Sequence, residues 1–504
     1  MKLIKAYSIL LIALLWSYNV FSQSNGITNN WILGYGSYAG YPNGHTRIEF
    51  VGGIPQITSD SLEMDINRTS ANISDAQGNL LFYTNGYYIA DASNDTMQNG
   101  NNISPTGFYN LAPKGLTVPQ ACLILPKPGS NSIYYVFHNT VDNGPQYNRS
   151  YCLYLSTIDM NLNNGLGAVT SKNVVLIQDT LNTGKISACK HANGRDWWVV
   201  VQRVNSNTYY KLLVSTNVIL GPYSQNIGNA RSVLPGGMTG FSPDGTKFAF
   251  FYAMYTTAGG LDVYDFNRCT GVLSNPVHVY IPQSTSFSGG LAFSGNSRFL
   301  YCANINELYQ FDMQSGNIAA SQQTVAVWDS FYSPSPPFAT LFEIPLLAPD
   351  GKIYISTGNS TFHLHIINNP DSAGLACDVQ QHAVQVPHYY SNALPNHPNY
   401  FLGCDSTLGC LCASTVGEPE LNPPQGNIKI FPNPNDGVFT LQFNVQSISG
   451  TLEIYDVMGK LVYKDYVAAW SQYKKVDVSN MPKGIYFCKI IRKEKSENVK
   501  VVKE

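Results

Sequence analysis

The stretch Gly240-Phe-Ser-Pro-Asp-Gly-Thr-Lys-Phe-Ala-Phe250 joins an apolar strand to a second, aromatic strand through a tight polar turn. The Asp-Gly pair at its centre supplies the positive φ that a two-residue hairpin requires. The same order of strand, turn and strand recurs in five further segments. These segments are residues 71–83, 123–137, 186–200, 292–301 and 347–355.

The turn glycines of the six segments follow one another at a regular distance. They lie at positions 78, 129, 194, 245, 295 and 351, and alternating strands such as Gly260-Leu-Asp-Val-Tyr-Asp-Phe266 fill the intervals. A repeat of about 40–50 residues or slightly more, with four short strands in each unit, is typical of β-propeller blades. The sequence therefore predicts an all-β chain whose main part is a propeller.

The number of blades follows from the length of the repeating part. Residues 31–403 accommodate seven units of about 50 residues, although only six copies of the turn motif are visible. We therefore expect a seventh blade shared between the two ends of the propeller, because sharing removes the open sheet edge. Its inner strand is expected at 392–401 and its outer strands at 31–35, 46–50 and 62–64. A ring of six blades is the alternative.

Composition excludes several classes of protein. The chain has 504 residues, of which 44% are hydrophobic, so a disordered body is excluded. Charged residues make up 12%, against roughly 25% in an average soluble domain. The net charge is −2 and no long basic run is present, so the sequence gives no electrostatic indication of a nucleic-acid partner.

The N-terminus has the pattern of a secretory signal peptide. Lys2 and Lys5 precede an apolar run from Ile9 to Trp16. Small or apolar residues follow, and we expect cleavage between Ser22 and Gln23. An uncleaved membrane anchor is the alternative, but the apolar run is short for a bilayer span. The mature chain is expected to be exported and to have no transmembrane span.

The ten cysteines fit an oxidising compartment. Cys122 and Cys488 lie in apolar runs and are expected to be buried as small hydrophobic side chains. Cys404, Cys410 and Cys412 cluster near the end of the propeller, where one or two disulfide bridges would hold the chain. A zinc site is the alternative, but the Cys-Leu-Cys spacing lacks the paired ligands that zinc sites use.

A change of composition divides the chain near residue 413. Residues 413–427 contain three prolines and no periodic apolar pattern, which indicates a linker. From residue 428 onward the chain has 12 Lys and Arg against 8 Asp and Glu, whereas the part before it is acidic. We expect a signal peptide at 1–22, the propeller at 23–412, the linker at 413–427 and a second domain at 428–504.

The propeller resembles a family of secreted propeller proteins from the Bacteroidetes. The resemblance covers nearly all of residues 31–403 and is carried by short ordered motifs. Among them are Ile73-Ser-Asp-Ala-Gln-Gly-Asn-Leu-Leu-Phe-Tyr83, Asp265-Phe-Asn-Arg-Cys-Thr-Gly271, Ala348-Pro-Asp-Gly-Lys-Ile-Tyr354 and Leu394-Pro-Asn396. The family supplies no catalytic residues that can be carried over, so the resemblance implies the fold and not an activity.

The C-terminal part contains about seven short alternating strands, which predict a small immunoglobulin-like β-sandwich. It also resembles the type A C-terminal sorting domain of the type IX secretion system. An ordinary accessory sandwich, such as a carbohydrate-binding module, is the alternative. The residues that match the sorting pattern are Pro432, Asn433, Pro434, Gly437, Asp456, Gly459, Lys460, Gly484, Tyr486 and Lys503.

The resemblance of this tail implies two partners and a location. The partners are the outer-membrane translocon of type IX secretion and its C-terminal signal peptidase, which normally removes the tail. The body would then be released or attached to surface lipopolysaccharide. The protein is therefore expected to pass through the periplasm and to end outside the cell or on the outer-membrane surface.

Candidate chemical sites are few. His363 and His365 share a strand face, and with His382, His388 and His397 they could form a metal site, although hydrogen bonding within loops and strands is the simpler interpretation. Residues 159–165 resemble a calcium loop but lack the usual glycine position and the closing glutamate. Motifs for a nucleophile elbow, a zinc protease or a phosphate loop are absent from the sequence. We therefore assign no catalytic residue, cofactor or metal.

These observations favour a non-enzymatic protein that binds an unknown glycan or protein ligand outside the cell. Trp197, Trp198 and the many tyrosines would supply stacking surfaces or blade packing. A secreted hydrolase or lyase acting on polysaccharide or peptide is one alternative, since scattered Asp and Glu leave a catalytic pair unlocated. A surface component in adhesion or gliding is another.

Overall fold

The computed structural model describes residues 26–51, 54–103, 115–139, 149–231, 236–252, 259–282, 288–333, 338–358, 360–413, 428–493 and 495–504. The expected signal peptide and its cleavage site at Ser22 and Gln23 lie outside these residues, as does nearly all of the expected linker. The described part is built from β-strands and a few single-turn 3-10 helices. These helices are η1 (Ser37–Ala39), η3 (Asn163–Gly165), η4 (Ala319–Ser321), η5 (Gly374–Cys377) and η6 (Ser406–Leu408).

Seven antiparallel sheets of three or four strands make up the described part of the propeller. The first two are β1 (Asn30–Gly34), β2 (His45–Glu49), β3 (Gln56–Asp60); and β4 (Ala71–Ser74), β5 (Leu80–Thr84), β6 (Ile89–Asp91). The third and fourth are β7 (Cys122–Pro126), β8 (Ile133–Asn139), β9 (Arg149–Asp159), β10 (Ala168–Asn182); and β11 (Ser187–Lys190), β12 (Trp197–Gln202), β13 (Ser206–Val214), β14 (Ile219–Arg231).

The remaining three sheets follow the same order of strands. They are β15 (Met238–Phe241), β16 (Lys247–Tyr252), β17 (Gly259–Asn267), β18 (Val272–Ile281); β19 (Gly290–Phe293), β20 (Phe299–Asn304), β21 (Glu307–Asp312), β22 (Gln323–Val327); and β25 (Pro345–Leu347), β26 (Ile353–Ser356), β27 (Thr361–Ile367), β28 (Val379–Tyr390). A short hairpin, β23 (Tyr332–Ser333) and β24 (Phe338–Ala339), lies between the last two sheets in sequence.

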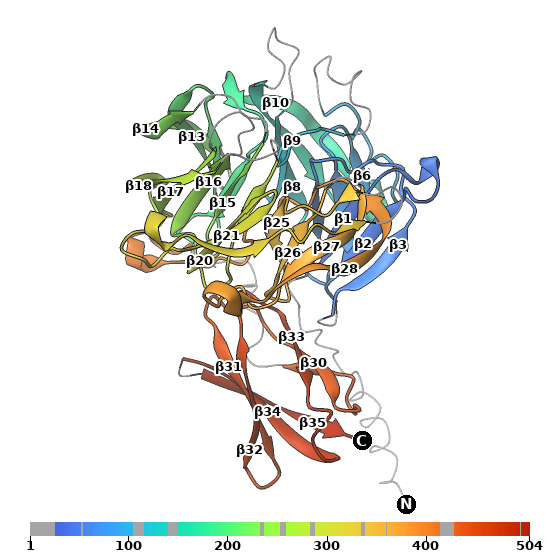
Figure 1. The fold of residues 1–504 in the computed structure, drawn as a ribbon. Helices are drawn as coiled ribbons and strands as arrows, with labels where there is room; N and C mark the ends of the chain where they lie inside the picture. Colours follow the sequence, from blue (N-terminus) through green and yellow to red (C-terminus); the bar gives the residue numbers. More distant parts are fainter. Residues whose placement is uncertain are drawn as a thin grey trace, which may run out of the picture.

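The sheets are arranged as a ring (Figure 1). The first strands of neighbouring sheets contact one another, as β4 does with β7 and β15 does with β19. Between the seventh sheet and the first, β28 contacts all three strands β1, β2 and β3. The described part therefore has the architecture of a β-propeller, as the repeat predicted.

The turn motif has the geometry that the sequence predicted. In five of the six copies the turn glycine has a positive φ, for example +73° at Gly245 and +80° at Gly351. The copy Ser294-Gly-Asn-Ser differs, because Ser297 takes the positive φ of +62° there. The change of sequence in this copy therefore alters which residue carries the turn, and the strands on both sides remain paired.

The expected shared blade is wrong in its details. Residues 392–401 form no strand, and residues 62–64 lie after β3 instead of in a strand. The strand at Asn30–Gly34 was expected at the outside of a blade, but β1 contacts β4 and its Trp31 lines the centre of the ring. Pro395 and Pro398 explain the first error, since each removes a backbone donor that a ladder between strands needs.

Residues 392–402, which we call the channel segment, instead connect the inner strands at the centre of the ring. The Asn396 amide nitrogen donates to the Cys122 carbonyl at 2.9 Å and to the Ile186 carbonyl at 3.0 Å, and its backbone N–H donates to Ser70. The Tyr400 hydroxyl donates to the Ile124 carbonyl at 2.8 Å. One segment thus contacts the second, third and fourth sheets or the residues that lead into them.

The start of the channel segment is tied to the other side of the ring. The Asn392 amide nitrogen lies 3.0 Å from the Ser288 hydroxyl and 3.2 Å from the Glu343 carboxylate, and the Ser288 hydroxyl also donates to Glu343. All three side chains are buried. Burial raises the pKa of Glu343 to about 7, although the charge of Arg68 acts in the opposite direction.

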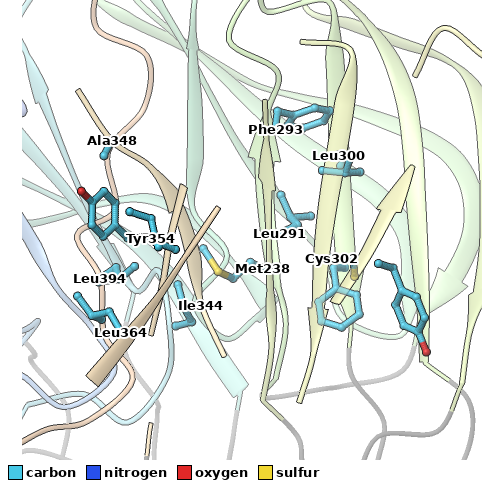
Figure 2. Packing of buried hydrophobic residues seen from close by; sticks show 14 of the residues in the cluster. Met238, Leu291, Phe293, Leu300, Cys302, Ile344, Ala348, Tyr354, Leu364 and Leu394 are labelled. Atoms are coloured by element: carbon cyan, nitrogen blue, oxygen red, sulfur yellow. The ribbon is translucent and has the colours of Figure 1, made fainter. Parts of the chain in front are cut away.

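Buried side chains fill the space between sheets. Figure 2 shows one such cluster, in which Met238 of β15 lies between Leu291 of β19 and side chains of the seventh sheet such as Tyr354 and Leu364. Leu394 of the channel segment belongs to the same cluster. The channel segment is therefore part of the hydrophobic core as well as of its hydrogen-bond network.

Two disulfides hold the chain that follows the channel segment. Cys404 is joined to Cys412, and Cys410 is joined to Cys269 in the turn between β17 and β18. This confirms the expected bridges. Cys122 and Cys488 are buried free cysteines, also as expected.

The tail is a sandwich of two sheets with its own hydrophobic cluster. One sheet has the order β29 (Lys429–Phe431), β30 (Val438–Gln442), β33 (Tyr473–Asp477), and the other has the order β32 (Leu461–Val467), β31 (Gly450–Asp456), β34 (Gly484–Arg492), β35 (Lys495–Lys503). In Figure 1 the tail lies below one face of the ring, with β31 and β33 nearest to it.

We predict that replacing Asn396→Leu destabilises the propeller by about 2–4 kcal/mol. The substitution keeps the size of the side chain but removes the donor that serves the carbonyls of Cys122 and Ile186, and a buried acceptor without a partner costs about 1–3 kcal/mol. Urea unfolding measures the change. The control is Asn161→Leu at an exposed turn, where an effect within about 0.5 kcal/mol is expected. Equal effects of both changes would contradict the anchoring role.

A second prediction concerns pH. Folding raises the pKa of Glu343 from 4.5 to about 7, so the folded protein keeps a proton that the unfolded chain releases in this interval. The stability that this group contributes is therefore present below pH 4.5 and is lost as the pH rises towards 7. Glu343→Gln removes this titrating group. Between pH 4.5 and pH 7 the free energy of unfolding of the wild type should therefore fall by up to about 3 kcal/mol relative to that of the variant.

Chemical unfolding at several pH values, with the exposed Glu63→Gln as control, measures this difference. Stability curves of wild type and Glu343→Gln that run parallel from pH 4 to pH 8 would show that the carboxyl does not titrate in this way.

Candidate functional sites

The residues of the sorting pattern gather at one end of the tail. Asp456 pairs with Tyr486 between β31 and β34, and Gly484 pairs with Lys503 between β34 and β35. Gly437 precedes β30, whose first residue pairs with Asp477 at the end of β33. Because these registers place all of them at the same ends of their strands, residues far apart in sequence form one surface region, which we call the sorting end.

Lys503 and Gly437 are held together at this end. The Lys503 amine donates to the carbonyls of Val478 and Ser479, at 3.0 and 2.6 Å. Gly437 has a φ of +108°, and a Cβ at this position would lie 2.6 Å from the Ser479 Cα. No other residue fits there without moving the backbone.

The other residues of the pattern fix turns and edges. The Asn433 side chain donates to the Lys500 carbonyl and accepts from the Val502 N–H, which fastens the Pro432–Pro434 segment to β35. The Asp456 carboxylate accepts from the backbone N–H of Met458 and Lys460, both at 2.9 Å, in the turn that contains Gly459. The Tyr486 hydroxyl donates to the Pro482 carbonyl.

The sorting end also has exposed apolar side chains that the sequence pattern did not indicate. Met458 is 87% exposed and Val457 is 65% exposed. Ile485 and Phe487 are exposed on β34 next to the paired residues of the pattern. An apolar region with a polar rim of this kind is typical of a protein-binding surface.

A second candidate site is a group of aromatic rings over the seventh sheet. Tyr41 stacks on Phe362 with 6.3 Å between the ring centroids, and the ring centroids of Phe362 and Tyr389 are 4.4 Å apart. Farther along, Phe331 stacks on His382 at 4.0 Å, and Trp328 contacts Tyr332 at 5.4 Å.

The two groups of rings come from neighbouring segments of the chain. The backbone N–H of Phe362 donates to the Ser333 hydroxyl in β23, and Phe331 lies 5.3 Å from His363. We call this group the aromatic surface. Its members are Tyr41, Trp328, Phe331, Tyr332, Phe362, His363, His382, His388 and Tyr389. Tyr41 and Tyr332 are exposed, whereas Tyr389 is buried.

Four of the five histidines proposed from sequence as metal ligands make side-chain hydrogen bonds to the protein, whereas the buried Nδ1 of His363 has no hydrogen-bond partner among the described residues. His382 bonds to the Asp329 carboxylate at 2.9 Å, and His388 bonds to the Ser59 hydroxyl at 2.7 Å. His365 is buried and His397 is half-buried; both contact backbone carbonyls, and desolvation lowers the pKa of each to about 4. These contacts support the interpretation as hydrogen-bonding side chains.

Among the described residues, the one group with metal-like spacing is His191, Cys269 and Cys410. Its two cysteines form a disulfide with each other, so they are not thiolate ligands in this structure. Residues 159–165 form the end of β9 and a polar turn with η3, in which Asp159 accepts from the Asn161 N–H.

Trp197 and Trp198 do not form a stacking surface. Both are buried in β12, and the Trp198 indole N–H donates to the Arg268 carbonyl at 2.8 Å. Trp197 packs against Tyr400 of the channel segment. Their role is blade packing, one of the two roles that the sequence left open.

A third candidate site is a cavity at the centre of the ring with a volume of about 170 Å³. Its walls come from the channel segment and from the inner strands β1, β7, β11, β15, β19 and β25. Apolar side chains such as Leu123, Met238 and Leu291 form most of the wall, with Gln120 and Asn396 as polar neighbours. Trp470 of the tail also lines it.

Two buried ionisable groups near the ring centre were missed from sequence. Besides Glu343, Lys185 is buried, and burial lowers its pKa to about 7. Its backbone carbonyl accepts from the Thr239 hydroxyl, whose residue lines the cavity. Neither group belongs to a recognisable motif, so only the fold could identify them.

Comparisons with known proteins place the tail in a family. Residues 429–504 match the family described as "Secretion system C-terminal sorting domain". No curated protein matches the chain. Within the described residues, no helix is long and apolar enough to cross a membrane.

Solved structures resemble the chain only distantly. The Dos1 propeller is 10% identical, with a TM-score of 0.40, and the match covers 73% of this chain and 86% of that one. A quinonprotein alcohol dehydrogenase-like protein from Bacteroides thetaiotaomicron is 11% identical, with a TM-score of 0.37 and coverage of 72% of this chain and 76% of that one.

Because of the family match, the tail at residues 429–504 is a type IX sorting domain, and the chain is exported to the cell surface or the extracellular space.

Proposed function

We propose that the protein is a non-enzymatic binding protein, delivered by type IX secretion, that binds a glycan through the aromatic surface of its seventh sheet. The observation that carries this proposal is the gathering of aromatic rings from β27, β28 and the adjacent segments beside the seventh sheet. Two of these rings are open to solvent, since Tyr41 is 78% exposed and Tyr332 is 52% exposed.

The chemistry of this surface suits a sugar. Aromatic rings offer flat apolar faces at a low cost in conformational entropy, and the apolar faces of sugar rings pack on them. Hydrogen-bonding groups stand at the ring edges, among them the Asp329 carboxylate with His382 and the Ser59 hydroxyl with His388. Sugar hydroxyls can exchange for such contacts.

The filled centre of the ring also supports a binding role. The channel segment occupies the axis and is fixed to several sheets, so a long substrate cannot pass through it. A glycan chain is therefore expected to bind at the periphery of the blades. A role in adhesion or gliding would use the same peripheral surface.

A secreted hydrolase or lyase is the second candidate, and Glu343 is the observation that favours it. A buried carboxyl with a pKa of about 7 can exchange protons near neutral pH. In this structure, however, its partners are Ser288 and Asn392. A panel of polysaccharide and peptide substrates separates the candidates, because turnover that disappears in Glu343→Gln would support the enzyme.

We predict that Tyr41→Ala and Tyr332→Ala each weaken glycan binding at least tenfold on a glycan array. Each variant removes one ring of the aromatic surface and leaves the blade intact, and aromatic residues dominate many binding surfaces. Tyr280→Ala is the matched control, since Tyr280 is 66% exposed on β18 of another sheet. Binding that survives both variants, or that is lost equally in the control, would place the ligand elsewhere.

A chain that ends at Gly426 should lose its signal peptide and remain in the periplasm. It keeps the N-terminal signal but lacks the sorting domain at 429–504. Cell fractionation followed by immunoblotting measures the distribution, with the full chain as control. Truncated protein found outside the cell would contradict the need for the tail in delivery.

A further inference from the structure

The tail contacts the propeller through the loop between β32 and β33. The Gln472 N–H donates to the Pro349 carbonyl at 2.8 Å, and the Tyr466 hydroxyl at the end of β32 donates to the Asp371 carboxylate at 2.7 Å. Tyr473 is buried in the same hydrophobic cluster as Trp31 of β1. We call residues 468–473 the tail loop.

Two turns of the propeller accept the tail loop because they carry glycine. A Cβ on Gly295 would lie 2.7 Å from the Ala469 carbonyl oxygen. A Cβ on Gly351 would lie 2.9 Å from the Ala468 Cβ. Two of the six turns that define the repeat thus also face the tail loop.

Trp470 of the tail loop is inserted into the propeller. Its side chain is 9% exposed and belongs to a cluster with Trp198, Phe248 and Leu402 of the ring. It lines the central cavity. Its φ is +62°, in a region where a bulky residue is strained by about 1–3 kcal/mol. The surrounding contacts hold the loop in this conformation.

We propose that the central cavity is a binding site for a neutral aromatic ring and that Trp470 occupies its mouth in the full chain. The tail loop then excludes the ligand for as long as the tail is docked. This site is separate from the aromatic surface, so the inference does not depend on the function proposed above.

The size and the walls of the cavity define the ligand. A cavity of about 150 Å³ lined by apolar side chains binds benzene, and this one has about 170 Å³ beside Trp470. Leu123, Met238 and Leu291 provide apolar walls, and Gln120 can offer a polar contact. An indole or phenol ring fits this chemistry, whether it is a free molecule or a side chain of a peptide.

The test uses full-length protein and indole as the probe, with binding measured by calorimetry. Gly295→Ala forces the tail loop away from the ring without changing the tail, and Trp470→Gly removes the occupant. Gly316→Ala is the matched control, because a Cβ there meets nothing within 4 Å. We expect both variants to bind indole at least tenfold more tightly than wild type and Gly316→Ala.

A second arm distinguishes the source of the ring. A blocked peptide with the sequence of residues 468–473 should compete with indole in Gly295→Ala if the site takes aromatic side chains. Indole binding without competition assigns it to free aromatic molecules.

Three results would overturn the proposal. They are equal indole binding by all four proteins, no binding by either variant, and binding by Trp470→Gly alone. Binding by Trp470→Gly alone would show that indole fills the space left by the missing side chain and that the tail loop does not exclude a ligand from the cavity. If Trp470→Gly does not fold, the comparison of Gly295→Ala with Gly316→Ala decides the question.

Discussion

The hydrogen bonds of Asn396 are the interaction on which the rest of the structure depends. A ring of sheets brings the backbone groups at the ends of its inner strands to one axis, where buried carbonyls need donors. Asn396 reaches carbonyls of the third and fourth sheets with one side chain, and its backbone reaches Ser70 before the second. The channel segment therefore connects the sheets at the centre of the ring, in place of the shared strand that we expected from the sequence.

This arrangement determines where ligands can bind. The axis is closed to a long substrate, and a small, mostly apolar cavity lies there next to the tail. The aromatic surface lies on the seventh sheet, close to the contact of β28 with the first sheet that completes the ring.

The sequence indicated the features that depend on local chemistry. The Asp-Gly turn at Gly245 and the strands on both sides could be predicted because hairpin geometry requires few residues. The small sandwich of the tail could be predicted for the same reason, since Gly437 and Asp456 fix turns within short segments. Its identity as a sorting domain was predicted from the resemblance of its motifs to that family.

Features that depend on distant contacts could not be predicted. The count of seven units led us to expect a strand at residues 392–401, but Pro395 and Pro398 prevent a ladder, and only the fold shows the carbonyls that Asn396 serves. The burial of Glu343 and the insertion of Trp470 likewise depend on segments that are far apart in the chain. The sequence could not show whether Trp197 forms a stacking surface or packs within a blade, because an aromatic residue in a strand faces the core or the solvent according to its partners. Its burial in the structure shows that it packs within a blade.

Hydrogen exchange measured by mass spectrometry on the full chain tests the central role of the channel segment most directly. Residues 392–402 have no regular secondary structure, so an ordinary loop of this kind would exchange within seconds. If the channel segment connects the sheets as described, its amides should exchange as slowly as those of the inner strands β7 and β11. Rapid exchange in the segment, with slow exchange in those strands, would contradict it.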